Sequence, residues 1–262
     1  MPVSVDELIA DLRAETLDLR ALLDPLDDAA FAAPTPAVGW TIRDQVTHLA
    51  FFDDAAVLAV ADGDRFRAEA AELMAAGMDF PDRIAARHAH LTATAARDCF
   101  ATARAGLLDV YSGRPARMRL PWYGPDMSVA SALTARIMES WAHGQDVADA
   151  LGVGRTPTDR LRNIAHLGVS TRGFSYALRG RTAPDADVRV ELLAPSGARW
   201  SWGDPGAVNR ITGPALDFCL VVTQRRHPGD TTLTIEGSAA AEWMSIAQAF
   251  AGASGPGRVR PT

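Results

Sequence analysis

Cysteine is scarce in this sequence: Cys99 and Cys219 are the only two among 262 residues. They form no Cys-x-x-Cys pair, so the sequence predicts neither a thiolate metal site nor a redox-active disulfide. Each lies in apolar surroundings, and we expect each to be a small buried residue. Any thiol chemistry would therefore need a thiol that a cofactor supplies.

Long runs of one residue type are also missing. No stretch approaches the ~20 apolar residues of a membrane-spanning helix. The first residues are acidic and lack a signal-peptide pattern, so we expect a cytoplasmic protein. The formal net charge is -6, without the basic footprint of nucleic-acid binding. We expect a small-molecule substrate, no nucleic-acid or membrane partner, and a monomer or homodimer.

The apolar fraction of 48% in 262 residues is enough for one large domain or two modest ones. Apolar residues recur at helical spacing in four stretches, and turn residues separate them. We predict long helices over residues 5–23, 41–62, 81–108 and 126–151. Helices of this length with short joins are typical of an antiparallel bundle, which we place at residues 1–153.

After residue 154 the pattern changes to a mixture of helix and strand. Alternation over 188–192 and 199–202 predicts a β-hairpin, and 231–236 is strand-like. The remaining stretches, 158–179, 213–225 and 239–251, are helical in pattern. The sequence therefore predicts an α+β fold with a small α+β domain at 154–252 and a flexible tail at 253–262.

Glu139 and His143 lie four residues apart in the last predicted helix of the bundle. On a helix such side chains are neighbours, with about 5–6 Å between their Cβ atoms, so both can bind one ion. His48 lies inside the second predicted helix, which a bundle can direct toward the same point. Two histidines and one carboxylate leave coordination positions open, as in catalytic zinc sites and some non-haem iron sites.

Simpler interpretations remain open for these residues. Glu139 and His143 would be spaced identically in a surface helix pair, and a lone histidine is often a hydrogen-bonded core residue. Asp146 fits a group that orients a ligand histidine, a proton shuttle, or a helix-surface charge. Four aromatic residues either line a pocket or fill a core: Trp40, Trp122, Tyr123 and Trp141.

Two segments resemble a known family. The stretch 39–49, Gly-Trp-Thr-Ile-Arg-Asp-Gln-Val-Thr-His-Leu, is similar to the segment that opens the metal-binding helix of DinB-like proteins. It resembles more closely the N-terminal domain of mycothiol-dependent maleylpyruvate isomerases. The stretch 138–146, Met-Glu-Ser-Trp-Ala-His-Gly-Gln-Asp, resembles the second ligand segment of that family. The similarity covers residues 5 to 152.

The resemblance implies a DinB-like four-helix bundle with a metal triad at His48, Glu139 and His143. It implies a divalent metal, for which we expect zinc, with iron, manganese and nickel as alternatives, and mycothiol as a second cofactor. The C-terminal part is similar to the sterol-carrier-like domain often fused to this bundle. In the isomerases an arginine of that domain reaches the active site, and Arg225 or Arg226 is the candidate match here.

In that family the metal is thought to activate the thiol of mycothiol, whose thiolate attacks an electrophilic carbon. The resemblance therefore implies an isomerase or an S-transferase acting on a small electrophilic substrate. Two alternatives stay open at this point. One is a metal-dependent cyclase, hydrolase or lyase that needs no thiol, and the other is a non-enzymatic small-ligand binder with a structural metal.

Overall fold

A computed structural model describes residues 4–77, 79–255 and 257–258. The chain divides into two compact units, Met1–Arg155 and Thr156–Thr262. The first unit is helical, and the second combines helices with a small mixed sheet, so the α+β class is confirmed. Within the described residues, no helix is both long and apolar enough to cross a membrane.

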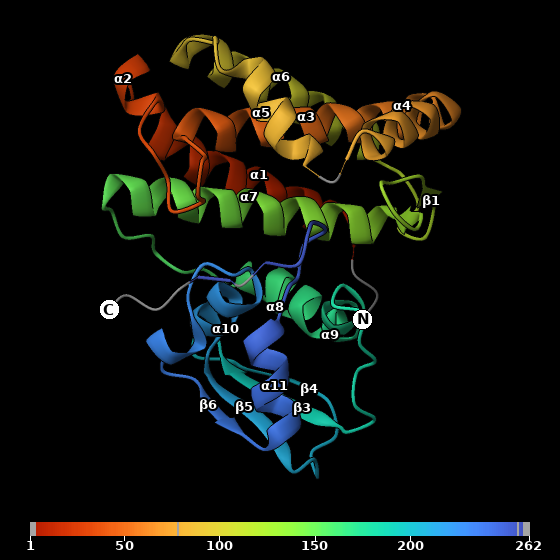
Figure 1. Cartoon of the computed structure of the whole chain (residues 1–262), viewed down its shortest axis with the longest axis vertical. Helices are drawn as coiled ribbons and strands as arrows, with labels where there is room; N and C mark the ends of the chain where they lie inside the picture. The colour runs from red at the N-terminus through yellow and green to blue at the C-terminus, as the bar shows by residue number, and fades with distance from the viewer. Residues whose placement is uncertain (1–3, 78, 256, 259–262) are drawn as a thin grey trace. The chain divides into compact units, whose positions relative to one another are not determined.

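The first unit contains four long helices, which Figure 1 shows side by side: α1 (Val5–Leu23), α3 (Ile42–Ala61), α6 (Ala93–Tyr111) and α7 (Val129–Leu151). Shorter elements connect them: α2 (Asp28–Phe31), α4 (Gly63–Ala75), α5 (Phe80–His88), β1 (Arg119–Leu120) and β2 (Met127–Ser128). Helix α3 contacts α6 and α7, and α7 also contacts α1. The pairing of α3 with α7 brings their facing side chains together in the interior of the unit.

Local sequence sets the ends of the two central helices. Thr41 and Asp44 form a reciprocal capping box at the start of α3, which satisfies two backbone N–H groups. Gly152 ends α7 in the left-handed conformation, at φ 66°, which costs glycine little because it has no Cβ. Both ends agree with the sequence-based prediction.

The prediction of one helix over residues 81–108 is wrong, because two helices, α5 and α6, occupy this stretch. Thr92 has an extended backbone, and its side chain accepts a hydrogen bond from the N–H of Ala95, so it caps α6. The N–H of Ala93 donates to Asp28 Oδ1, which satisfies a second backbone group at this end. These contacts separate α6 from α5.

The interior of the first unit is filled by apolar side chains from all four long helices. Leu23, Leu49, Phe100 and Val147, one from each helix, lie in one buried cluster. Burying a side chain of this size stabilises the fold by about 1.5–3 kcal/mol. Cys99 differs from the prediction: it is exposed on α6.

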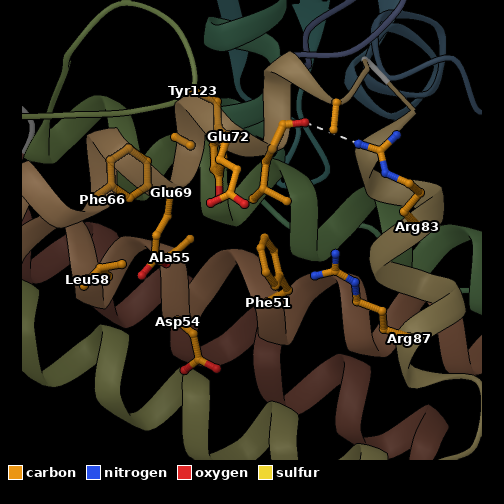
Figure 2. Close-up of a pocket in the computed structure, with 13 residues that line it drawn as sticks. Phe51, Asp54, Ala55, Leu58, Phe66, Glu69, Glu72, Arg83, Arg87 and Tyr123 are labelled. Carbon is orange, nitrogen blue, oxygen red and sulfur yellow. Dashed lines mark hydrogen bonds between the residues drawn. The ribbon is translucent and has the colours of Figure 1, made fainter.

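A cavity of about 460 Å³ lies between α3, α4 and α5. Three aromatic rings, those of Phe51, Phe66 and Tyr123, line it, and Figure 2 shows Arg83 and Arg87 at one end. Carboxylates also line the cavity: Asp54, Glu69 and Glu72. Of the residues predicted to line an aromatic pocket, Tyr123 is the one that reaches this cavity.

The second unit is built on a four-stranded sheet with strand order β4-β3-β5-β6. Strands β3 (Val188–Leu193) and β4 (Arg199–Trp202) form the predicted antiparallel hairpin. The sequence pattern did not predict β5 (Asn209–Pro214), which pairs parallel to β3 and antiparallel to β6 (Thr234–Glu236). The helices of this unit are α8 (Leu161–Ser170), α9 (Arg172–Ala177), α10 (Ala215–Val222), α11 (Ser238–Ile246) and a 3-10 turn, η1 (Pro228–Asp230). Of the predicted tail, residues 256 and 259–262 lie outside the described part.

Candidate metal centre

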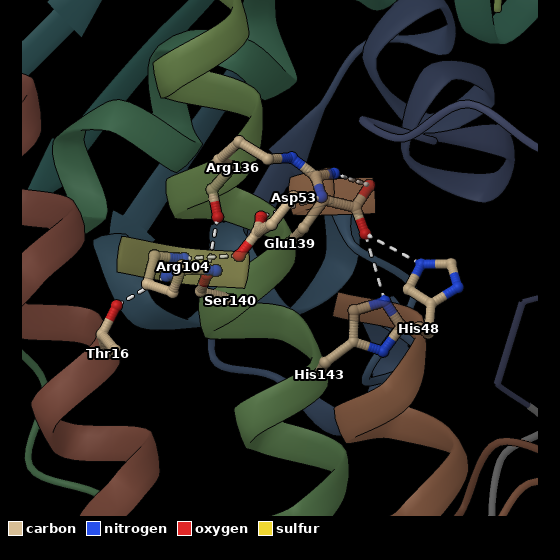
Figure 3. A network of polar contacts seen from close by, with 8 residues as sticks. All are labelled: Thr16, His48, Asp53, Arg104, Arg136, Glu139, Ser140 and His143. Atoms are coloured by element: carbon tan, nitrogen blue, oxygen red, sulfur yellow. Dashed lines mark hydrogen bonds and ion pairs between the residues drawn. The ribbon is translucent and has the colours of Figure 1, made fainter. Parts of the chain in front are cut away.

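Two helices of the first unit bring three ligand-type side chains together. His48 projects from α3, and Glu139 and His143 project from successive turns of α7 (Figure 3). One possible ligand atom from each residue lies within 4.8 Å of the other two. Glu139 Oε2 is 3.1 Å from His143 Nε2 and 3.9 Å from His48 Nε2. The three residue types therefore converge on one point, as the sequence predicted.

The cluster is largely buried, and burial determines its charge. Burial, followed by the nearby His143, lowers the pKa of His48 to about 4, so His48 is neutral at neutral pH. Burial opposes ionisation of Glu139, but His143, His48 and Arg136 outweigh it and hold the pKa of Glu139 well below its usual value. A neutral imidazole and an ionised carboxylate are the forms in which these side chains bind metals.

A chain of hydrogen bonds determines which nitrogen of His143 carries a proton. The backbone carbonyl of Trp40 can only accept, so the Thr35 hydroxyl donates to it over 2.9 Å. Thr35 Oγ1 in turn accepts from Gln45 Nε2 over 2.9 Å, which leaves Gln45 Oε1 facing His143 Nδ1. That oxygen needs a donor, so His143 carries a proton on Nδ1. With Nδ1 protonated, Nε2 is the nitrogen that can offer a lone pair toward Glu139.

This arrangement fits a cation between the three side chains. His143 Nε2 and the Glu139 carboxylate face each other at 3.1 Å, so a proton on Nε2 or a metal ion between the two atoms can join them. Since two imidazoles and a carboxylate converge and only three protein ligands are present, the donor set suits a divalent metal with open positions.

A buried charged network adjoins Glu139 (Figure 3). Arg136 Nη2 is 3.9 Å from Glu139 Oε1, and Arg136 Nη1 is 3.8 Å from Asp53 Oδ1. Asp53 Oδ2 accepts from Arg104 Nε over 2.6 Å. Arg104 also donates to Thr16 and, over 2.9 Å, to Ser140. Positive and negative groups thus alternate from α6 to the triad.

Aromatic rings surround the two histidines. The Trp40 ring is 5.1 Å from the His48 ring and stacks on His143 at 6.0 Å, and Trp40 Nε1 donates to Asp82 over 2.7 Å. Phe52 packs against His48 at 4.6 Å. Trp122 and Tyr123 both contact Phe52, at 6.2 and 5.4 Å, so they are one ring removed from His48. Aromatic rings thus cover part of both histidines.

The other predicted site residues have different surroundings. Trp141 is buried on α7, and Arg155 lies over its ring at 5.7 Å. Asp146 is fully buried on the same helix, so it is not a surface charge. Arg225 and Arg226 follow α10 in the second unit, where they donate to the backbone carbonyls of Thr223 and Arg225. Roles for these residues, and substrate binding by the aromatic residues, stay predictions.

Sequence analysis did not identify four residues that support the triad: Gln45, Asp53, Arg104 and Arg136. Gln45 lies one turn before His48, and Arg136 lies one turn before Glu139, so helical spacing from the ligands was the available signal. Asp53 and Arg104 are 51 residues apart in the sequence, and no local pattern links them.

Comparison with known proteins agrees with this geometry. The family described as Mycothiol maleylpyruvate isomerase N-terminal domain matches residues 12–148, which contain all three ligand-type residues. Two proteins of Mycobacterium tuberculosis, from strains CDC 1551 / Oshkosh and H37Rv, are each 47% identical over 261 residues, covering 95% of this chain and 97% of theirs. Both are named only as uncharacterized proteins.

Two solved structures have a similar fold. The mycothiol-dependent maleylpyruvate isomerase matches with a TM-score of 0.57 and 16% identity, covering 89% of this chain and 93% of that one. A histidine-to-alanine mutant of such an isomerase matches with a TM-score of 0.62 and 15% identity, covering 88% and 93%. At these identities the similarity concerns the fold alone. Because its family match spans more than half of the sequence, this chain belongs to the mycothiol maleylpyruvate isomerase N-terminal domain family.

Proposed function

We propose that this protein is a metal-dependent enzyme that works with a small thiol of the mycothiol class. It would act as an isomerase or an S-transferase on a small electrophilic substrate. The observation that carries the proposal is the convergence of His48, Glu139 and His143 in a largely buried site. Structural zinc sites are normally closed by four protein ligands, whereas three ligands leave a position for a reacting molecule.

His48, Glu139 and His143 would hold the metal, for which zinc is our first choice and iron, manganese and nickel are alternatives. A bound divalent metal supplies Lewis acidity, which lowers the pKa of a coordinated thiol or water. The protein contributes orientation and shielding. Gln45 fixes the tautomer of His143, and the rings of Trp40 and Phe52 exclude water from one side of the histidines.

The thiol is proposed to come from outside the chain. Cys219 is buried in the second unit, and burial raises the pKa of its thiol well above its usual value, which makes it a poor nucleophile. Cys99 is exposed on α6, and α6 contributes no ligand to the triad. The protein therefore offers a site that suits thiol activation without offering an obvious thiolate of its own.

The two proposed reactions share a first step and differ in the second. A thiolate adds to one carbon of a double bond conjugated to a carbonyl, and the electron pair moves onto the carbonyl side. Rotation followed by loss of the thiolate returns the thiol and gives the other geometric isomer. Protonation of the adduct instead leaves the thiol attached. We propose Asp146 as the group that handles the proton, and Arg225 or Arg226 as the partner of an anionic substrate group.

The first test combines metal analysis with an activity assay. Protein purified without a chelator or an affinity metal is analysed by elemental mass spectrometry, beside the His48→Ala variant. We expect near-stoichiometric metal in the wild type, little in the variant, and conversion of maleylpyruvate or another unsaturated ketoacid only when mycothiol is added. Turnover that needs metal but no thiol would favour the hydrolase, lyase or cyclase alternative. Equal metal in both proteins would refute the site.

A further inference from the structure

The buried charges beside the triad form a line of alternating sign. Arg104, Asp53, Arg136 and Glu139 follow one another, separated by 2.6, 3.8 and 3.9 Å. Buried ion pairs rarely stabilise a fold more than apolar residues of the same volume would, because removing charges from water costs energy. Stability alone is therefore a weak explanation for this network.

The two arginines of the network are bonded very differently. Arg104 is fully engaged, since its three nitrogens donate to Asp53, Thr16 and Ser140. Arg136 approaches Asp53 and Glu139 only at ion-pair distance. Among the described residues, neither Arg136 Nη1 nor Asp53 Oδ1 has a hydrogen-bond partner. Arg136 thus lies between two carboxylates, at ion-pair distance from each.

The two oxygens of Glu139 face different partners. Oε2 faces the Nε2 atoms of His143 and His48, whereas Oε1 faces Arg136 Nη2. We propose that Arg136 is a positioning residue that retains Oε1, so that Glu139 offers a metal only one oxygen. This inference rests on the proposed metal site. Its consequence is that one more position on a bound metal would stay open for thiol or substrate.

Burial distinguishes this role from direct contact with substrate. The Arg136 side chain is only 6% exposed, and its guanidinium lies 5.8 Å from the ring centres of both Phe52 and Trp122. These rings contact the guanidinium through cation–π interactions and carry no negative charge. The charge that its Nη2 faces at the metal centre is Glu139. Arg136 is therefore suited to act through Glu139.

The test uses Co²⁺, which takes zinc positions and whose visible absorption weakens as its coordination number rises. The full-length protein, freed of metal, is titrated with Co²⁺ as wild type, Arg136→Met and Arg136→Lys. Methionine keeps an unbranched apolar stem against the two rings, and Asp53 keeps its pair with Arg104, so the Met variant should fold. Circular dichroism and thermal unfolding check this, and Arg136→Gln replaces it if it does not fold.

Arg97→Met is the matched control. Arg97 also lies over a phenylalanine ring, that of Phe31 at 5.4 Å, and donates to the backbone carbonyls of Leu23 and Leu26. It belongs to neither the triad nor the line of charges. A general effect of losing an arginine should therefore change the Co²⁺ spectrum of both Met variants. Loss of the proposed positioning of Glu139 should change only the spectrum of Arg136→Met.

We expect Arg136→Met to bind Co²⁺ with a marked loss of visible absorption, because Glu139 then binds through both oxygens. Arg136→Lys, which keeps the charge, and Arg97→Met should resemble the wild type. If folded Arg136→Met gives the wild-type Co²⁺ spectrum or takes up no Co²⁺, the inference about Arg136 is wrong while the metal site stands. If the wild type itself takes up no Co²⁺, the metal site and this inference both fail.

Discussion

Replacing Gln45 with an uncharged residue should weaken metal binding, and the size of the effect tests how His143 is prepared as a ligand. Its side chain is fully buried, with Oε1 accepting from His143 and Nε2 donating to Thr35. Leucine has nearly the same volume and removes both contacts without introducing charge. The Gln45→Leu substitution therefore tests whether the hydrogen-bond chain from Trp40 to His143 presets the ligand nitrogen.

The expected size follows from the proton on His143. Without Gln45, a proton on Nδ1 is a buried donor with no acceptor, which costs about 1–3 kcal/mol. The proton can move to Nε2 instead, where Glu139 Oε2 accepts it at 3.1 Å, but that tautomer blocks metal binding. The metal must therefore overcome about 1–3 kcal/mol, which is about 5-fold to 150-fold in Kd. Loss of comparable partners of ligand histidines typically costs about 10–100-fold.

Zinc affinity is measured by competition with a chromophoric chelator, with circular dichroism to check folding. Gln45→Glu is the matched control, because a carboxylate keeps an acceptor oxygen at the same place and should leave the affinity at or above the wild-type value. An unchanged zinc Kd in Gln45→Leu would refute the argument from the tautomer. Equal weakening in both variants would show that the packing around residue 45 or the Nε2 donor to Thr35, which both variants lose, matters rather than the acceptor.

Two further predictions concern the metal-free protein. In the folded protein the pKa of His48 is lowered from 6.5 to about 4. Between these pH values the unfolded chain binds this proton more readily than the folded protein does. The free energy of unfolding should therefore fall as the pH drops from 6.5 to about 4. At about 1.4 kcal/mol per pKa unit the loss is about 3 kcal/mol, and urea unfolding of His48→Phe across this range should lack most of that slope. The second prediction concerns Arg104→Met, which leaves buried Asp53 with only the longer contact to Arg136. The substitution should lower the free energy of unfolding by about 3–5 kcal/mol in the same assay. Arg65→Met, at an exposed ion pair, should change that free energy little. A loss below about 1 kcal/mol for Arg104→Met would contradict the assigned network.

Sequence predicted the long helices where local signals mark their ends. The capping box at Thr41 and the glycine at position 152 are such signals, and α3 begins and α7 ends as expected. Helix α7 begins at Val129, later than predicted, because the two residues before it form strand β2 and pair with β1. The break between α5 and α6 depends instead on Thr92 and on Asp28, a residue from a distant part of the chain. Strand β5 was missed because its partners, β3 and β6, are non-local. Local spacing does not reveal pairings of that kind.

Local signals in the sequence also identified the ligand-type residues, whereas the residues that support them are linked only by non-local contacts. Glu139 and His143 are one helical turn apart, so spacing alone raised them as a pair. Bundle geometry allowed His48 as the third ligand, and the family resemblance supported all three. Gln45 contacts His143 across 98 residues of sequence, so periodicity could not connect them. Sequence also left open whether Asp146 is a surface charge. The residue is fully buried on α7, which excludes that interpretation. The supports of this site therefore had to come from the three-dimensional arrangement.

Charge balance around the triad bears on the identity of the fourth ligand. Glu139, Arg136, Asp53 and Arg104 contribute two negative and two positive charges, so the line is neutral by itself. A divalent metal at the triad would add two positive charges to this neutral line. An uncompensated positive charge in a buried site is costly, so such a site favours an anion at the open position. A coordinated thiol or water meets this need by losing its proton, whereas a neutral carbonyl does not. Charge balance thus supports an anionic fourth ligand, which the proposed thiolate would supply.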